Sequence, residues 1–235
     1  DSRGLNPSEI TIAEMLRENG YATGCFGKWH LGDQPEFMPL NQGFDTYFGI
    51  PYSNDMWPQH KRNNPITKRK YEPLPVMKQD KAVAHVADEF DQSLLAEVIT
   101  DEAIAFIEKN QKRPFFCYIP HAHVHSPRYA RPEYLERAEG NVDRAHVEEV
   151  DDSIGRVLQT LRDLKLELYD LSKDLGERKD LSGKHPEMVK ELDRLLQEHA
   201  SGIAANLRPA GFAENPKPIL KEVGDLPTLR NYLGK

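Results

Sequence analysis

Two basic side chains, Lys28 and His30, follow a short apolar run that ends at Gly27. In an extended segment, side chains two apart share one face, so the ammonium and the imidazole should project together while Trp29 packs on the other side. An ammonium neutralises an anion as a point charge, and an imidazole can pass a proton to a leaving oxygen. The pair therefore suits an anionic ester, although a lysine and a histidine at this spacing more often form an ordinary surface pair.

A second group of candidates comprises His121, His123 and His125, which follow an apolar run at residues 115–119. If strand geometry persists beyond that run, the three imidazoles share one face and form a credible ligand set for a divalent metal such as zinc. The zinc interpretation lacks the further Asp or fourth ligand of a His-x-His-x-Asp-His site. A purely structural cluster of imidazoles is the alternative.

Alternating helices and apolar strands must position these groups. The pattern predicts a helix over residues 11–20 capped by Asn6 or Ser8, a strand at 21–26 and a long loop at 31–76. It then predicts a helix at 91–110, a strand at 115–119, helices at 141–164 and 187–199, and an irregular tail. In the helix at 141–164, six apolar residues recur at helical spacing and are expected on the buried face: Val147, Val150, Ile154, Val157, Leu158 and Leu161. The acidic run at 148–152 is expected on a solvated face. This order indicates an α/β domain with helices on both sheet faces.

Composition and charge exclude some classes of partner. The chain has 235 residues, of which 31 are Lys or Arg and 38 are Asp or Glu, so it is mildly acidic. No basic stripe alternates with aromatic residues, so we expect no nucleic-acid partner. No apolar run is long enough to span a bilayer, so we expect no membrane partner. Cys25 and Cys117 lie in apolar runs and are predicted to be buried small hydrophobes.

Several phrases, taken in order along the chain, resemble those of the sulfatase family in its arylsulfatase A-like branch. They are Gly-Lys-Trp-His-Leu-Gly at 27–32, Asn-Gln-Gly-Phe-Asp at 41–45, the segment at 48–55, the Pro-Phe-Phe strand with its histidines at 114–127, and the segment at 168–181. The resemblance implies an alkaline phosphatase-like fold: a mixed sheet between helices, truncated here, with a C-terminal helical or extended segment. It divides the chain into a partial core domain at residues 1–167 and a C-terminal segment at 168–235.

The same resemblance assigns roles to four side chains. Lys28 and His125 match positions that contact the substrate sulfate, and Ser53 matches one that hydrogen-bonds the substrate, although an ordinary turn serine is the simpler interpretation. His30 matches a catalytic position that orients the nucleophile or assists proton transfer. On this basis we rank His125 as an anion ligand first, a structural cluster second and a zinc site third.

The family activity implied is hydrolysis of sulfate esters, either small molecules or glycans, by a formylglycine nucleophile with calcium. Formylglycine arises from Cys or Ser in a Cys-x-Pro-x-Arg pattern, and neither Cys25, Cys117 nor Ser126 fits it. The Asp-Asn pair that helps to hold calcium in the family is missing as well. We therefore predict an inactive chain. The resemblance implies calcium in the intact family, and a chain without calcium is the alternative. The alternatives are a vestigial oxyanion-binding fragment and a metalloenzyme built on the histidine cluster.

Two further expectations follow from the resemblance. The family location is periplasmic or extracellular, although the chain shows no signal segment. In addition, Lys28, His30 and His125 should converge in one cleft near the strand ends, with Ser53 at its rim, because α/β sheets bind ligands at that edge.

Overall fold

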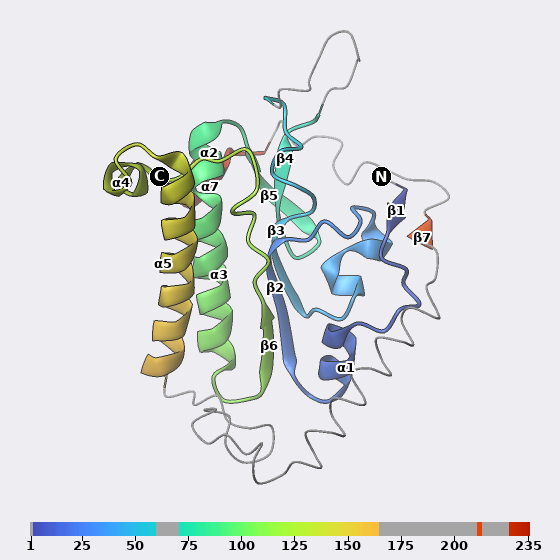
Figure 1. Cartoon of the computed structure of the whole chain (residues 1–235). Coiled ribbons are helices and arrows are strands. Elements are labelled where there is room, and N and C mark those ends of the chain that lie inside the picture. The colour runs from blue at the N-terminus through green and yellow to red at the C-terminus, as the bar shows by residue number, and fades with distance from the viewer. Residues whose placement is uncertain (1, 60–70, 165–210, 213–225) are drawn as a thin grey trace, which may run out of the picture.

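A five-stranded mixed sheet lies at the centre of the chain (Figure 1). The structure, a computed structural model, describes residues 2–59, 71–164, 211–212 and 226–235. The strand order is β5-β4-β3-β2-β6, with β2 at Ala22–Lys28, β3 at Thr46–Ile50, β4 at Leu74–Lys78, β5 at Lys81–Val86 and β6 at Phe115–Tyr118. Strand β2 is parallel to β3 and β6, whereas β4 is antiparallel to β3 and β5. A separate antiparallel pair joins β1 (Arg3–Gly4) to β7 (Gly211–Phe212).

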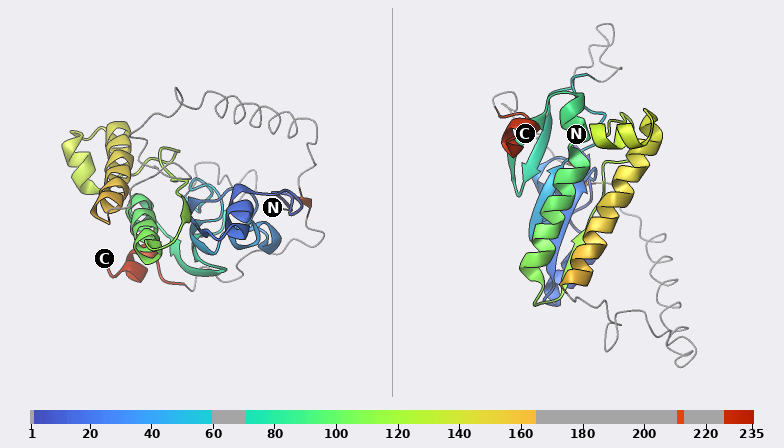
Figure 2. Two further views of the ribbon diagram at one scale, coloured as in Figure 1. Left: turned by 90° about the horizontal axis from the view of Figure 1, so that it is seen from below. Right: turned by 90° about the vertical axis from the view of Figure 1, so that its left-hand side faces the viewer.

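Helices cover both faces of the sheet. They are α1 (Ile12–Glu18), α2 (Glu89–Ser93), α3 (Leu95–Asn110), α4 (Pro132–Arg137), α5 (Val142–Asp163) and α7 (Leu229–Leu233), with 3₁₀ turns at Pro35–Phe37 and Pro39–Asn41. Helices α3 and α5 lie on one side of the sheet, and α1 and the 3₁₀ turns lie on the other (Figures 1 and 2). The expected class, a mixed sheet between helices, is confirmed.

The two sheet faces carry two apolar clusters. Phe26 and Phe48 are fully buried in the cluster that includes the apolar residues of α3. The neighbouring side chains Cys25 and Tyr47 alternate to the opposite face, where they pack with Trp29. Because both faces are buried, the sequences of these parallel strands are short apolar runs in which polar residues do not alternate with apolar ones.

The first helix begins close to its predicted start, but its cap is not one of the two residues that the sequence suggested. Its cap is Thr11, whose Oγ1 accepts a hydrogen bond from the Glu14 N–H at 3.0 Å, while Glu14 Oε2 accepts one from the Thr11 N–H at 2.8 Å. This reciprocal pair is a capping box. The prediction of Asn6 or Ser8 as the cap was therefore wrong, and the Ser8 N–H donates instead to Asn6 Oδ1 in the preceding turn.

Other predicted boundaries also change. The loop predicted at 31–76 contains β3 and the start of β4. The helix predicted at 91–110 begins earlier, at Glu89 with Asp88 as its cap, and is interrupted at Leu94 between α2 and α3. The tail includes the short helix α7. The predicted helix at 187–199 and the predicted division at 167/168 lie outside the described residues, so both stay predictions.

Helix α5 turns a polar side toward the rest of the fold. Three of the six apolar residues expected inside are exposed by 58%, 49% and 41%: Val147, Ile154 and Leu158. The other three are partly buried, and Val157 and Leu161 pack against the main core as expected. The fully buried side chains of α5 are one alanine and three polar residues, each at most 5% exposed: Ala145, His146, Glu149 and Ser153. The expectation that the whole acidic run is solvated therefore fails at Glu149.

Residues 226–235 pack back against the main sheet. Leu229 is fully buried in the same apolar cluster as the α3 residues. Asp91 Oδ1 accepts hydrogen bonds at 3.1 Å from both the backbone N–H and the Nε–H of Arg230. The His85 N–H donates to the Pro227 carbonyl at 3.1 Å. These contacts fix α7 beside β5 and α2.

Both cysteines are free thiols on neighbouring parallel strands. Cys25 is fully buried and Cys117 is half-buried. Burial raises the pKa of the Cys117 thiol to about 12 and that of Cys25 further still. Both therefore stay protonated and behave as small hydrophobes, as predicted. Among the helices that the structure describes, none is long and apolar enough to cross a membrane.

Candidate functional site

The ends of three parallel strands meet at one edge of the sheet. Backbone hydrogen bonds join them: Lys28 N–H to Pro120 O at 2.7 Å, Trp29 N–H to Ile50 O at 3.0 Å, and His30 N–H to Pro51 O at 3.1 Å. Lys28 closes β2, Ser53 follows β3, and His125 follows β6. This edge is where α/β sheets bind ligands.

Glycine allows these strand ends to lie unusually close together. Gly27 and Gly49 have φ values of 141° and 153°. A Cβ on Gly49 would lie 1.9 Å from the Gly27 carbonyl oxygen, and one on Gly27 would lie 2.1 Å from the Pro120 oxygen. Any larger side chain would therefore push the strand ends apart.

The backbone leaves strand geometry immediately after Lys28. His30 has a φ of 56°, in the left-handed region, so an alternating strand does not explain the direction of its side chain. Trp29 is buried on the opposite face as predicted, and its Nε1–H donates to the Phe37 carbonyl at 2.8 Å. Lys28 is half-buried and His30 is exposed.

Electrostatic interactions link His30 to residues of all three strand ends. Burial lowers the pKa of the His30 imidazole most, and the positive charges of Lys28 and His125 lower it further, whereas Asp55 opposes them. The structure thus brings Lys28, His30 and His125 into one electrostatic neighbourhood, together with an aspartate from the loop after β3. Ser53 is only 2% exposed rather than at a rim, and its Oγ has no hydrogen-bond partner in the described part of the chain.

The chain also turns directly after β6, so the three histidines that follow do not share one face. The His121 N–H bonds to Ile119 O at 3.1 Å, and the His125 N–H bonds to Ala122 O at 3.2 Å. The expectation of persistent strand geometry was wrong. Among these three, only His125 is exposed, and its Nδ1 lies 2.5 Å from the Ser126 carbonyl oxygen.

His121 is anchored to α5 and α3 by a chain of hydrogen bonds. Its Nε2 lies 3.0 Å from Ser153 Oγ, which lies 2.6 Å from Thr100 Oγ1. Thr100 donates to the Ala96 carbonyl, so Ser153 must donate to Thr100 and His121 must donate to Ser153. This order places the imidazole proton on Nε2. The buried Nδ1 then carries no proton, and it has no hydrogen-bond partner among the described residues. Burial accordingly lowers the pKa of His121 to about 4; His123 adds to the shift and Glu149 opposes it.

His123 and His146 lie in a buried polar group beside this chain. Their ring centroids are 3.8 Å apart. His123 Nε2 is 3.5 Å from Glu149 Oε2, and the two side chains are 4% and 1% exposed. Burial lowers the pKa of His146 to about 3, with His123 and Arg128 lowering it further.

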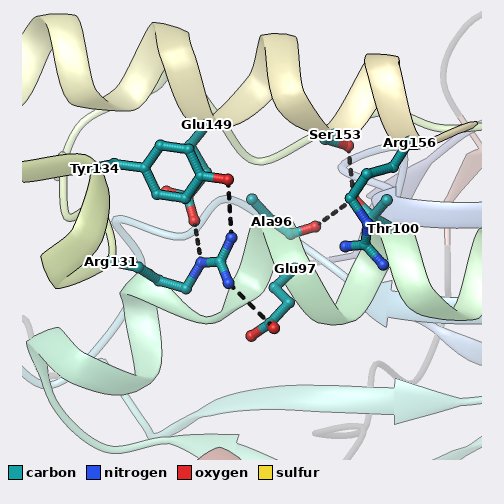
Figure 3. A pocket seen from close by; sticks show the side chains of 8 residues that line it. All are labelled: Ala96, Glu97, Thr100, Arg131, Tyr134, Glu149, Ser153 and Arg156. Atoms are coloured by element: carbon teal, nitrogen blue, oxygen red, sulfur yellow. Dashed lines mark hydrogen bonds and ion pairs between the residues drawn. The ribbon is translucent and has the colours of Figure 1, made fainter. Parts of the chain in front are cut away.

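Arg131 holds the other oxygen of the Glu149 carboxylate. Its Nε–H donates to Glu149 Oε1 at 2.8 Å, and its other nitrogens contact Glu97 Oε1 at 3.1 Å and the Tyr134 hydroxyl at 3.1 Å. Figure 3 shows this arginine between α3, α4 and α5, at a small cavity that Ser153 and Thr100 also line. Sequence reasoning missed this group, because Glu149 was expected on a solvated face of α5.

The metal predictions can be tested against these positions. Within residues 2–59, 71–164, 211–212 and 226–235, no group of three or more His, Cys, Asp or Glu side chains is placed to hold a metal ion. The described residues therefore fit neither the three-histidine zinc site nor a calcium site.

Comparisons with known proteins agree with this architecture. The sequence model of the Sulfatase family matches residues 3–167. The chain is 33% identical over 168 residues to N-acetylgalactosamine-6-sulfatase from Homo sapiens, covering 68% of this chain and 31% of that protein. It is 32% identical over 179 residues to arylsulfatase A from Homo sapiens, covering 69% of this chain and 34% of that protein. The chain therefore belongs to the sulfatase family and is arylsulfatase-like.

Solved structures give the same fold. The PsFucS1 sulfatase from Pseudoalteromonas sp. matches with a TM-score of 0.62 at 24% identity, covering 70% of this chain and 37% of that one. The structure of Ps i-CgsB in complex with k-i-k-neocarrahexaose matches with a TM-score of 0.57 at 25% identity, covering 71% of this chain and 39% of that one. The chain spans about a third of the length of the curated relatives that it matches.

Proposed function

We propose that this chain carries the oxyanion-binding half of a sulfatase site, formed by Lys28, His30, Ser53 and His125. The observation that carries the proposal is the meeting of three parallel strand ends, at which Lys28 and His125 both act electrostatically on His30. Two cationic or hydrogen-bond-donating groups beside a neutral imidazole suit a tetrahedral oxyanion.

Each residue has a distinct role in this proposal. Lys28 supplies a positive charge to the sulfate oxygens. His125 commits Nδ1 to the Ser126 carbonyl, which leaves Nε2 for the anion when the ring is protonated. His30, with its lowered pKa, is mainly neutral near pH 7 and can accept or pass on a proton. Ser53 offers a buried hydroxyl that lacks another partner among the described residues.

We further propose that this chain alone does not hydrolyse sulfate esters. Hydrolysis in the family requires formylglycine to attack sulfur, and no Cys-x-Pro-x-Arg pattern occurs in the sequence. The described residues do not fit calcium, so no step is assigned to that ion. Removal of a covalent nucleophile leaves only the contribution of binding and positioning.

The substrate class and location are also proposals. Names of relatives such as N-acetylgalactosamine-6-sulfatase, and the carrahexaose complex of Ps i-CgsB, support a sulfated glycan or a smaller sulfate ester as the ligand. We expect neither a nucleic-acid nor a membrane partner. A periplasmic or extracellular location is the family expectation.

Sulfate titration tests the binding proposal. We expect a dissociation constant in the millimolar range, on the order of −4 kcal/mol, because a half-pocket is open to water and salt. Bound sulfate should also raise the pKa of His30, because the anion offsets the repulsion from Lys28. NMR of the imidazole signals measures both quantities.

The variant Lys28→Ala should weaken sulfate binding to tens of millimolar or beyond, by roughly tenfold. Lys109→Ala, which removes the same charge from an exposed position on α3, should leave binding unchanged. Equal losses in the two variants would show that sulfate responds only to net charge, and the proposed pocket would then be wrong.

A chromogenic aryl sulfate with added calcium tests the absence of turnover. We expect no hydrolysis above background from the purified chain. Hydrolysis that follows the protein through purification and disappears in Lys28→Ala would contradict the proposal and would require another group to attack sulfur.

A further inference from the structure

We propose that Glu149 on α5 is a positioning residue for the proposed sulfate ligand His125, and that it acts through His123. This inference rests on the proposed function. Glu149 belongs to α5 and not to the strand ends, and its effect is to hold the loop at residues 119–127 so that His125 stays at the edge of the sheet.

The loop is attached to α5 at alternate residues. His121 donates to Ser153 on α5, and His123 Nε2 lies 3.5 Å from Glu149 Oε2, four residues earlier on the same helix. His125 is the next residue in this alternation, and it is exposed. Two buried imidazoles thus form the anchored part of the loop, and the third is presented to solvent.

The Glu149 carboxylate is itself held in place. Oε1 accepts a hydrogen bond from Arg131, which also contacts Glu97 on α3 (Figure 3). Oε2 and His123 Nε2 are both buried and lie 3.5 Å apart, and neither atom makes a hydrogen bond in the regions that the structure describes. Because a buried unpaired acceptor and a buried unpaired donor are both costly, each group favours the loop position that brings them together.

Such an anchor matters for a weak anion site. A ligand residue on an untethered loop must be ordered when the anion binds, and the free energy of that ordering is lost from the affinity. The hydrogen-bond chain through Ser153 ends at the backbone of α3. The loop is therefore attached to the helices on that side of the sheet. Removing the Glu149 contact should release His123 and, two residues later, His125.

The test compares Glu149→Gln with Glu148→Gln in the full chain. Both variants remove one negative charge from adjacent positions on α5, but Glu148 contacts only the surface arginines Arg144 and Arg137 among the ion pairs of the described residues. Electrostatics alone predicts equal or slightly tighter sulfate binding in both variants. Positioning predicts about tenfold weaker binding in Glu149→Gln alone.

A rescue variant separates positioning from general damage. The double variant His123→Gln with Glu149→Gln supplies a neutral donor–acceptor pair of side-chain amides at the same contact, so we expect it to recover most of the sulfate affinity that Glu149→Gln loses. Urea unfolding of each variant establishes that it is folded. If Glu149→Gln binds sulfate as Glu148→Gln does, or if the amide pair restores nothing, the inference is wrong.

The imidazole NMR signal of His125 provides a readout that does not require sulfate. It should broaden or split in sulfate-free Glu149→Gln and stay sharp in Glu148→Gln. If the unmodified chain binds no sulfate, the proposed function fails, and the His125 signal still decides the positioning claim. An unchanged signal in Glu149→Gln overturns it.

Discussion

Acidification should destabilise the folded chain through two buried imidazoles, His121 and His146. Burial lowers their pKa values from 6.5 to about 4 and about 3. As the pH falls below 6.5, the unfolded chain binds protons at these residues while the folded chain does not. The stability contributed by the neutral imidazoles is therefore present above about pH 6.5 and is lost progressively as the pH falls toward the folded-state values.

The size of the effect follows from these values. At about pH 5, proton binding to one imidazole with an unfolded pKa of 6.5 stabilises the unfolded state by about 2 kcal/mol. Proton binding stabilises the folded state hardly at all, because both folded-state pKa values lie below that pH. The two residues together should lower the free energy of unfolding by about 4 kcal/mol between about pH 7.5 and pH 5. That is a large part of the roughly 5–15 kcal/mol typical of a folded domain.

Urea unfolding at the two pH values measures this loss. His121→Gln and His146→Gln should each reduce the pH-dependent loss by about 2 kcal/mol, and the double variant should reduce it by about 4 kcal/mol. Leu158→Gln, at an exposed position on α5, changes no titratable group and should show the full pH-dependent loss of stability. If acidification from about pH 7.5 to about pH 5 destabilises the double variant as much as the unmodified chain, these imidazoles already accept protons in the folded state, and the burial argument is wrong.

Further substitutions test the packing. Leu229→Ala should reduce the free energy of unfolding by about 2–5 kcal/mol, because the side chain is fully buried, and a smaller loss by urea titration would show that α7 is not part of the core. Gly49→Ala should prevent stable folding, since its Cβ would lie 1.9 Å from a carbonyl oxygen, whereas Gly155→Ala in open space on α5 should stabilise the chain by up to about 1 kcal/mol. Circular dichroism and thermal melting distinguish these outcomes, and equal effects of the two substitutions would contradict the close approach of the strands at Gly49. Thr11→Ala should cost about 1 kcal/mol through loss of the capping box, and an unchanged melting temperature would show that another group caps α1.

The elements with a strong apolar signal were predictable from sequence. The apolar residues at helical spacing along α3 are buried, and β2 and β6 lie close to their predicted bounds. Because parallel strands need cover on both faces, their continuous apolar runs also indicated the sheet class. The expectation that Lys28 and His125 lie near the strand ends came from the family resemblance together with this sheet class.

What the sequence could not reveal depends on partners from distant segments. Strand β3 has only five residues with a glycine among them, and its pairing with β2 determines its structure more than its own pattern does. The buried side of α5 was predicted only in part, at Val157 and Leu161, because Glu149 and Ser153 carry no hydrophobic signal. Their burial is explained by Arg131 and His121, which approach from other elements.

The docking of α7 also has a consequence for the folding of the chain during synthesis. Arg230 contacts Asp91 across 139 residues of sequence, and Leu229 fills a position in the core that otherwise consists of much earlier residues. The sheet and α3 can form from local segments as they leave the ribosome, but this core position stays open until residue 229 has emerged. Contacts of such long sequence separation are slow to form and leave apolar surface exposed in the meantime. A nascent chain that is paused before residue 226 should therefore be a better chaperone substrate than the released protein.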